Sequence, residues 1–323
     1  MEEPTLAIRG LRAAFPGRTG LVTAVDGVDL TVPHGTIVGL VGESGCGKSV
    51  TALSVMGLLP PPGRVLEGRL RFAGQDLLTL SPKAWRKLRG DRMAMIFQDP
   101  MTSLNPVYSV GRQVAEVLRL HRGLTRPQAR QQTIDLFRQV GIPDPAARYD
   151  AYPRQLSGGL RQRVMIAMAM ACHPQLLIAD EPTTALDGTI QAQILRLMDQ
   201  LRRDHGTAVL LITHNMGVVA QVCDLVYVMY AGQIVEAAET FSLFAAPRHP
   251  YTLGLLRAIP SLETERERLD TIPGVVPDLA DPPPGCRFCP RCAWAGPECA
   301  QAMPPLTDRG EGHLVRCFRE VTP

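Results

Sequence analysis

The chain has 323 residues, of which 45% are hydrophobic, 20% charged and 5% aromatic, and its formal net charge is +3. That charge is too small to predict binding to nucleic acid or an anionic membrane surface, and the few aromatics argue against a single-strand platform. The start, Met-Glu-Glu-Pro, is not a secretory signal, and the longest wholly apolar run, 164–172, is too short to cross a bilayer. We expect a soluble, cytosolic protein of about two domains that serves any membrane through partners.

The N-terminal part of the chain predicts strands that lead into a loop. Residues 28–32 alternate between apolar and polar, which is the period of a half-buried strand. Residues 36–41 form a mostly apolar run of strand length, and an apolar helix pattern follows a glycine-rich loop. From about residue 99 the pattern becomes helical: Thr125 and Gln128 suit a capping box, and Gly141 suits a helix end.

Strands and helices alternate again after residue 161. Prolines and charges dominate from residue 260, which predicts a linker into a C-terminal module. The overall rhythm predicts an α/β protein. The expected elements of this second part are a strand at 176–179, a helix at 190–203, a strand at 208–213 and a hairpin over 225–235.

One glycine-rich segment carries the strongest motif in the chain. Residues 42–49 read Gly-Glu-Ser-Gly-Cys-Gly-Lys-Ser, which fits G-x-x-x-x-G-K-[ST] between an apolar strand and a helix. Glycines let successive backbone N–H groups turn toward phosphate oxygens, and a helix N-terminus favours negative charge. Lys48 would reach the outer phosphates, and the Ser49 hydroxyl would bind Mg²⁺. The nucleotide contacts predicted here are Gly42, Glu43, Ser44, Gly45, Cys46, Gly47, Lys48, Ser49 and Val50.

An acidic pair ends the strand expected at 176–179. Asp180 and Glu181 follow a buried apolar run, where two charges are costly unless they are used. Alone, such a pair is usually a solvated strand end. In a chain that also has a phosphate loop, Asp180 suits the Mg²⁺ shell, and Glu181 suits a general base that polarises the attacking water.

Residues 156–159, Leu-Ser-Gly-Gly, narrow the class of NTPase. Ser157 and the amides of Gly158 and Gly159 open a helix and form a second anion-binding end. In this place between the other motifs, the segment resembles the signature of the ABC ATPase family. The resemblance implies that this end faces the γ-phosphate of an ATP held by the other subunit of a head-to-tail dimer.

Further positions match motifs of the same family. Gln98 resembles the Q-loop glutamine, which touches Mg²⁺ and water, and His214 resembles the switch histidine, which contacts the γ-phosphate. Asp187 matches the D-loop, and Phe15 is the expected aromatic residue that stacks on adenine. The resemblance implies a competent ATPase site in which Glu181, His214 and Gln98 are catalytic.

Several stretches resemble the oligopeptide/dipeptide importer ATPases within that family, namely 42–52, 97–106, 249–252 and the tail from 284. The resemblance implies ATP-driven import of short peptides, with this subunit peripheral on the cytoplasmic face of the cell membrane. It implies a second, related ATPase subunit, two permeases and an external binding protein as partners, and no nucleic acid. Nickel importers share the subfamily, so nickel or another small solute is an alternative cargo.

Two other classes of ABC protein fit less well. A soluble ABC ATPase acting on nucleic acid or ribosomes usually has two cassettes or a long coiled-coil insert, which this chain lacks. A regulatory subunit that only binds nucleotide would not need Glu181 and His214. The chain departs from the family pattern at Leu160, where many members have Gln, and at Cys46, which predicts sensitivity of the ATPase to thiol reagents.

Five cysteines lie between residues 286 and 317. Disulfides are not expected in a reducing compartment, which leaves a four-cysteine zinc site, an iron–sulfur cluster or no metal. The importer family commonly carries a similar tail, and some members are associated with a four-iron cluster. The resemblance implies a [4Fe–4S] cluster, or Zn²⁺ in its place, with Cys289 as an alternative ligand to the expected set of Cys286, Cys292, Cys299 and Cys317.

These expectations define two domains. Residues 1–258 are predicted to form the ABC ATP-binding domain, an α/β P-loop NTPase fold with an antiparallel β subdomain and a helical subdomain at about 99–163. Residues 259–323 are predicted to form a small cysteine-rich C-terminal extension. A metal would staple an extension that is too small to hold a large core.

Overall fold

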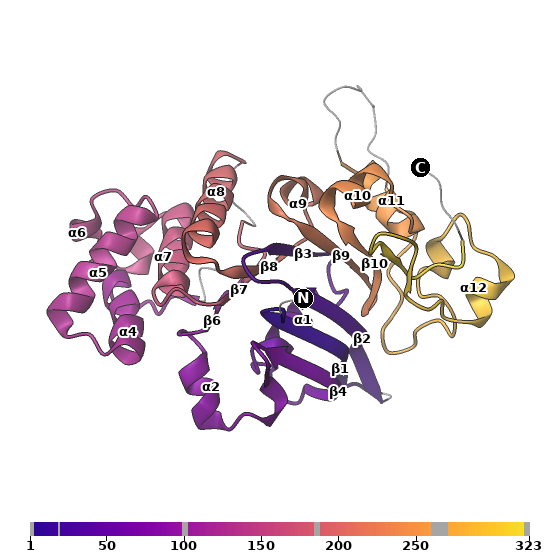
Figure 1. Ribbon diagram of the computed structural model, residues 1–323, viewed down its shortest axis with the longest axis horizontal. Helices are drawn as coiled ribbons and strands as arrows, with labels where there is room; N and C mark the ends of the chain where they lie inside the picture. The colour runs from indigo at the N-terminus through magenta and orange to yellow at the C-terminus, as the bar shows by residue number, and fades with distance from the viewer. Residues whose placement is uncertain (1–2, 19, 99–102, 184–187, 260–270, 320–323) are drawn as a thin grey trace. The chain divides into compact units, whose positions relative to one another are not determined.

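The computed structural model describes residues 3–18, 20–98, 103–183, 188–259 and 271–319 (Figure 1). The chain divides into two compact units. The first unit comprises residues 1–5, 32–36 and 79–211, and the second comprises residues 6–31, 37–78 and 212–323. Within the described parts of the chain, no helix is long and apolar enough to cross a membrane.

The second unit contains an antiparallel sheet with the strand order β2-β1-β4-β5. Leu6 pairs with Phe72 and Ile8 with Leu70, and all four side chains are fully buried, so one face of the sheet packs into the core. This is the antiparallel sheet expected of the ABC fold, and the alternating segment 28–32 lies in it. Its strands are β1 (Leu6–Pro16), β2 (Leu21–Val32), β4 (Arg64–Phe72) and β5 (Gln75–Asp76).

A second sheet runs through this unit in the order β11-β12-β10-β9-β3. The strand β3 (Ile37–Val41) is buried throughout and pairs in parallel with β9 (Leu225–Tyr230). Continuous burial of a short apolar strand is typical of parallel pairing. Val41 lies opposite Val228, so the loop that follows β3 starts beside the end of β9.

The C-terminal residues add strands to that sheet. β9 and β10 (Gln233–Glu239) form the expected hairpin, and β12 (Leu314–Val315) pairs with β10, with Glu236 opposite Val315. β11 (Thr307–Asp308) pairs with β12. The C-terminal segment is therefore joined by hydrogen bonds to the sheet that carries the phosphate-loop strand.

The helices of the second unit surround these strands. α1 begins directly after the glycine-rich loop, with Gly47 as its N-cap. The helices are α1 (Lys48–Val55), α9 (Met216–Val222), α10 (Thr240–Ala245), α11 (Pro250–Arg257) and α12 (Pro297–Gln301), with a 3₁₀ turn η3 (Cys289–Arg291).

The first unit is mainly helical. Several of its helices lie within the segment 99–163, which was predicted to be helical. Thr125 N donates to Gln128 Oε1 at 3.0 Å, which confirms the predicted capping box, and Gly141, with φ of 70°, follows the end of that helix. The elements are η1 (Leu77–Thr79) at its border, then α2 (Pro82–Leu88), α4 (Val110–Arg122), α5 (Arg126–Gln139), α6 (Pro145–Arg148), η2 (Pro153–Gln155), α7 (Gly158–Met170) and α8 (Gly188–His205).

Buried strands in this unit carry the acidic pair. β6 (Met93–Ile96) and β7 (Leu176–Asp180) pair in parallel, with Ile96 opposite Ala179, and β8 (Ala208–Thr213) follows in the order β8-β7-β6. The strands predicted at 176–179 and 208–213 are therefore present. Because carboxyl ends of parallel strands meet at one edge, the residues after β6 and β7 lie close together.

Candidate nucleotide-binding site

The glycine-rich loop has a backbone that only glycine fits at two positions. Gly42 has φ of 155° and Gly47 has φ of 108°. A Cβ at Gly42 would lie 2.1 Å from Met229 O, and a Cβ at Gly47 would lie 2.4 Å from Ala24 O. The loop therefore packs directly on neighbouring backbone, which fixes where its amides point.

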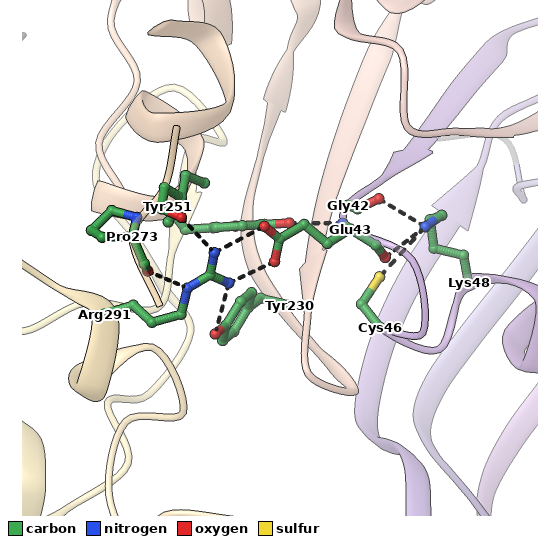
Figure 2. A network of polar contacts seen from close by, with 9 residues as sticks. Gly42, Glu43, Cys46, Lys48, Tyr230, Tyr251, Pro273 and Arg291 are labelled. Carbon is green, nitrogen blue, oxygen red and sulfur yellow. Dashed lines mark hydrogen bonds and ion pairs between the residues drawn. The ribbon is translucent and has the colours of Figure 1, made fainter. Parts of the chain in front are cut away.

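Lys48 lies inside this loop as the first residue of α1. Its Nζ donates to Gly42 O at 2.8 Å and to Glu43 O at 2.9 Å (Figure 2). The side chain is buried, and the ammonium group bridges backbone of the opposite side of the loop. Of the other predicted contacts, Ser44 and Gly45 are exposed at the tip, whereas Ser49 and Val50 are half-buried in the first turn of α1. The loop therefore places a cation and a helix N-terminus together, as phosphate binding requires.

Cys46 is fully buried under the loop. Its Sγ lies 3.7 Å from Lys48 Nζ, and burial raises the pKa of the thiol despite that neighbouring cation. Thiol reagents attack exposed thiolates. The predicted sensitivity of this cysteine to thiol reagents is therefore not supported by its surroundings.

The acidic pair and the predicted Q-loop glutamine lie together in the first unit. Gln98 Nε2 donates to Glu181 Oε2 at 3.1 Å, and the parallel register of β6 and β7 brings the two residues together. Asp180 is buried at the end of β7, and Glu181 has φ of 46°, which is uncommon for a residue with a side chain. Residues in such sparsely populated backbone conformations cluster at functional sites.

The signature residues form an exposed helix N-terminus. Ser157 is the N-cap of α7, and its Oγ accepts a hydrogen bond from Leu160 N at 3.4 Å. Ser157 and Gly158 are exposed, and Gly159 is half-buried. The amides that open α7 therefore face solvent, which leaves room for an anion.

The remaining predicted site residues are His214, Phe15 and Asp187. His214 is exposed between the end of β8 and Asn215, the N-cap of α9. Phe15 is half-buried near the end of β1, with its ring packed against Gly63. Asp187 lies outside the described residues, as do 99–102 of the predicted Q-loop stretch and 260–270 of the predicted linker.

The structure adds residues to the phosphate loop that the motifs do not contain. Arg291 Nη1 lies 2.7 Å from Glu43 Oε2, and Tyr251 OH accepts a hydrogen bond from Glu43 N at 2.8 Å (Figure 2). Tyr251 lies in the stretch 249–252, which sequence reasoning used only to identify a subfamily. No local signal pointed to Arg291, because it follows Glu43 by 248 positions.

The cysteines of the C-terminal segment are the predicted metal ligands. The backbone N–H of Cys286 donates to Cys299 O at 2.8 Å. Burial is the main cause that raises the pKa of the Cys292 thiol to about 11, and neighbouring cysteines add smaller effects. All of the expected cysteines lie in described residues. Within the described ranges, however, no group of three or more His, Cys, Asp or Glu side chains is arranged to hold a metal ion. The expected [4Fe–4S] or zinc site is therefore not supported by this geometry.

Comparison with known families agrees with the motifs. A family model described as ABC transporter matches residues 25–184, and one described as oligopeptide/dipeptide transporter, C-terminal region, matches residues 235–299. The dipeptide transport ATP-binding protein DppD of Escherichia coli (strain K12) is 51% identical, over 97% of this chain and 95% of the relative. The dipeptide transport ATP-binding protein DppD of Bacillus subtilis (strain 168) is 48% identical, over 98% and 95%.

Solved structures show the same fold. The dimeric ATP-binding cassette MJ0796, in a post-hydrolysis state bound to ADP and Pi, superposes with a TM-score of 0.66 at 25% identity. It covers 73% of this chain, and 98% of the cassette is matched. The chain belongs to the ABC transporter family, among the ATP-binding proteins of its oligopeptide/dipeptide transporters.

Proposed function

We propose that this chain is the ATP-hydrolysing subunit that powers uptake of short peptides through an ABC importer. The observation that carries the proposal is its 51% identity, over nearly the full length of both chains, to a dipeptide transport ATP-binding protein. The phosphate loop, the Gln98–Glu181 contact and the exposed start of α7 supply the chemistry that such a subunit needs.

The phosphate loop supplies binding. Its amides and the N-terminus of α1 complement the negative charge of the nucleotide, and Lys48 adds a buried cation at the loop. Ser49 and Asp180 are the residues that would hold Mg²⁺, which neutralises charge on the phosphates when bound. Phe15 is proposed to stack on adenine.

Hydrolysis needs a base aimed at water. Glu181 is proposed to take the proton of the attacking water, and Gln98, which donates to its carboxylate, orients it. His214 is proposed to contact the γ-phosphate, and Asp187 to act in the D-loop. The hydrogen bond from Gln98 holds the carboxylate of Glu181, which lowers the cost of orienting it during the reaction.

The open start of α7 implies a second subunit. Ser157, Gly158 and Gly159 expose an anion-binding end, and the similar cassette MJ0796 is dimeric. We propose that this end binds ATP held by a related partner ATPase, under two permeases and an external binding protein. The subunit is proposed to lie at the cytoplasmic face of the membrane. Its proposed domains are residues 1–258 and 259–323.

The iron–sulfur cluster stays a prediction without support from the geometry. Its test is direct: the purified full-length chain either carries iron and a visible chromophore or does not. Loss of both in Cys286→Ser and Cys317→Ser variants would establish those ligands. A colourless, iron-free and zinc-free chain prepared without oxygen would rule the metal out.

The decisive experiment measures ATP hydrolysis by the complex purified through this subunit from its own membranes, together with its binding protein. Short peptides are expected to stimulate turnover, and Glu181→Gln is the control that should remove the stimulated activity. Stimulation by Ni²⁺ instead of peptides would keep the ATPase and change the cargo. If no permease accompanies the subunit, the importer proposal is wrong.

A further inference from the structure

Arg291 comes from the turn between two cysteines of the C-terminal segment and reaches the phosphate loop. Its guanidinium forms a two-pronged ion pair with Glu43: Nη1 lies 2.7 Å from Oε2, and Nη2 lies 3.0 Å from Oε1. The Arg291 side chain is only 4% exposed. Parallel hydrogen bonds of this kind fix orientation as well as distance, because the fork matches a carboxylate.

The remaining N–H groups of Arg291 are also used. Nε donates to Pro273 O at 2.9 Å, Nη2 to Ile272 O at 3.2 Å, and Nη1 to Tyr230 OH at 3.3 Å. A buried guanidinium with every donor engaged has one favourable position. The Arg291 side chain is therefore held in one conformation, unlike a solvent-exposed arginine.

Glu43 is held a second time through its backbone. Its N–H donates to Tyr251 OH, and Tyr251 is fully buried against Tyr230 and Phe288, with ring centroids 4.6 and 5.5 Å apart. Phe288 belongs to the same cysteine-rich segment as Arg291. The segment thus contributes both to the ion pair and to the aromatic packing behind it.

The same residue connects this support to the phosphate-binding lysine. Glu43 O accepts a hydrogen bond from Lys48 Nζ, while the Glu43 carboxylate is held by Arg291 (Figure 2). A change in the position of Glu43 must therefore move a carbonyl that orients Lys48. The chain of contacts runs from the cysteine-rich turn to the cation of the phosphate loop.

We propose that Arg291 is a positioning residue through which the C-terminal cysteine-rich segment sets the affinity of the phosphate loop for nucleotide. The proposal rests on the loop binding ATP, as proposed above. With the Arg291–Glu43 pair intact, the loop keeps the shape in which its amides converge. Without the pair, the loop binds nucleotide more weakly although the segment remains attached.

Other contacts attach the segment independently of the loop. Arg316 donates from Nε to Ile234 O at 2.9 Å and from Nη1 to Pro304 O at 3.2 Å, and β12 pairs with β10. Neither contact involves residues 42–49. Arg316 is therefore a matched control: it is an arginine of the same segment whose Nε donates to strand β10 and not to the phosphate loop.

The experiment measures the dissociation constant of Mg·ATP for the full-length chain by calorimetry. Arg291→Lys, which keeps the charge and loses the fork, is expected to weaken binding about tenfold, whereas Arg316→Lys changes it less than about twofold. In the assembled complex, Arg291→Lys should raise KM for ATP and leave kcat within about twofold. Equal effects of the two arginine variants would overturn the proposal.

A double-mutant cycle tests whether Arg291 acts through Glu43. Arg291→Gln and Glu43→Gln should each weaken Mg·ATP binding, and the double variant should be no weaker than the poorer single one, because it leaves no buried charge unpaired. Losses that multiply in the double variant would show independent roles and contradict the proposal. If Arg291→Gln does not fold, Arg291→Lys replaces it, and its loss of affinity should be smaller in the Glu43→Gln background than in the unaltered chain. A wild-type chain that binds no Mg·ATP would instead refute the proposed function.

Discussion

Two helix N-termini in this chain are proposed to bind phosphate through backbone amides, and their surroundings differ. α1 starts in a loop whose Gly47 and Lys48 are buried and whose Glu43 is held by Arg291. α7 starts at an exposed Ser157 and Gly158, capped by the hydroxyl of Ser157 itself. The N-terminus of α1 is therefore held by distant residues of its unit, whereas the N-terminus of α7 is exposed to solvent.

This difference predicts that the two helix N-termini have different roles in nucleotide binding. A loop whose shape is fixed before binding loses little conformational freedom when the nucleotide arrives, so it can bind within one chain. Among the described residues, the exposed N-terminus of α7 is capped only by Ser157. We expect it to bind phosphate well only when a partner subunit presents the nucleotide. Substitutions at α1 should therefore affect nucleotide binding by a single subunit, and substitutions at α7 should affect turnover by the assembled pair.

The largest effect is expected at Gly47. In Gly47→Ala, the new Cβ would lie 2.4 Å from Ala24 O at a φ of 108°, so the loop must distort. We expect roughly a hundredfold loss of Mg·ATP affinity, measured by calorimetry on the full-length chain. Gly123→Ala, directly after α4, is the control, because its φ is also positive, its Cβ would meet no atom within 4 Å and it lies outside the loop. Unchanged binding by Gly47→Ala would show that the loop is not rigid.

Glu181→Gln should separate binding from hydrolysis. Removal of the proposed base should lower turnover by roughly a hundredfold or more and leave Mg·ATP binding nearly intact. Single-turnover measurements on the assembled complex would show trapped ATP. Glu239→Gln, at an exposed strand end, is the control. Turnover close to that of the unaltered complex would mean that another group is the base.

Gly158→Asp tests the open end. A carboxylate there would repel phosphate, so we expect turnover of the complex to fall about tenfold, while Mg·ATP binding by the single chain changes less than about twofold. Gly158→Ala is the matched control, since its Cβ would meet no atom within 4 Å. A loss of single-chain binding in Gly158→Asp would contradict the proposed division of work.

The smallest effect is expected at Cys46. Because the loop is proposed to bind phosphate through backbone amides, Cys46→Ser should change Mg·ATP affinity less than about twofold. The thiol itself is fully buried, and burial raises its pKa, so it should react slowly. Titration with a chromogenic disulfide reagent should give the same count of rapidly reacting thiols in the folded variant and the unaltered chain. One fewer rapid thiol in Cys46→Ser would show that the loop opens.

The local elements of this protein and their motifs were predictable from the amino-acid sequence alone. The phosphate loop, the acidic end of β7 and the Ser-Gly-Gly start of α7 are each encoded within a few residues, because backbone conformation and helix capping depend on near neighbours. The capping box at Thr125 and Gln128 and the strand at 208–213 were predictable for the same reason.

The distant residues that support those motifs could be identified only from the folded chain. Arg291 and Tyr251 reach Glu43 because β3 pairs with β9 and the C-terminal segment docks on β10, and no local pattern encodes those pairings. The burial of Cys46 likewise depends on its surroundings rather than its neighbours in sequence. The spacing of the cysteines suggested a metal, but ligand geometry is fixed by the folded positions of side chains, and spacing alone does not determine it.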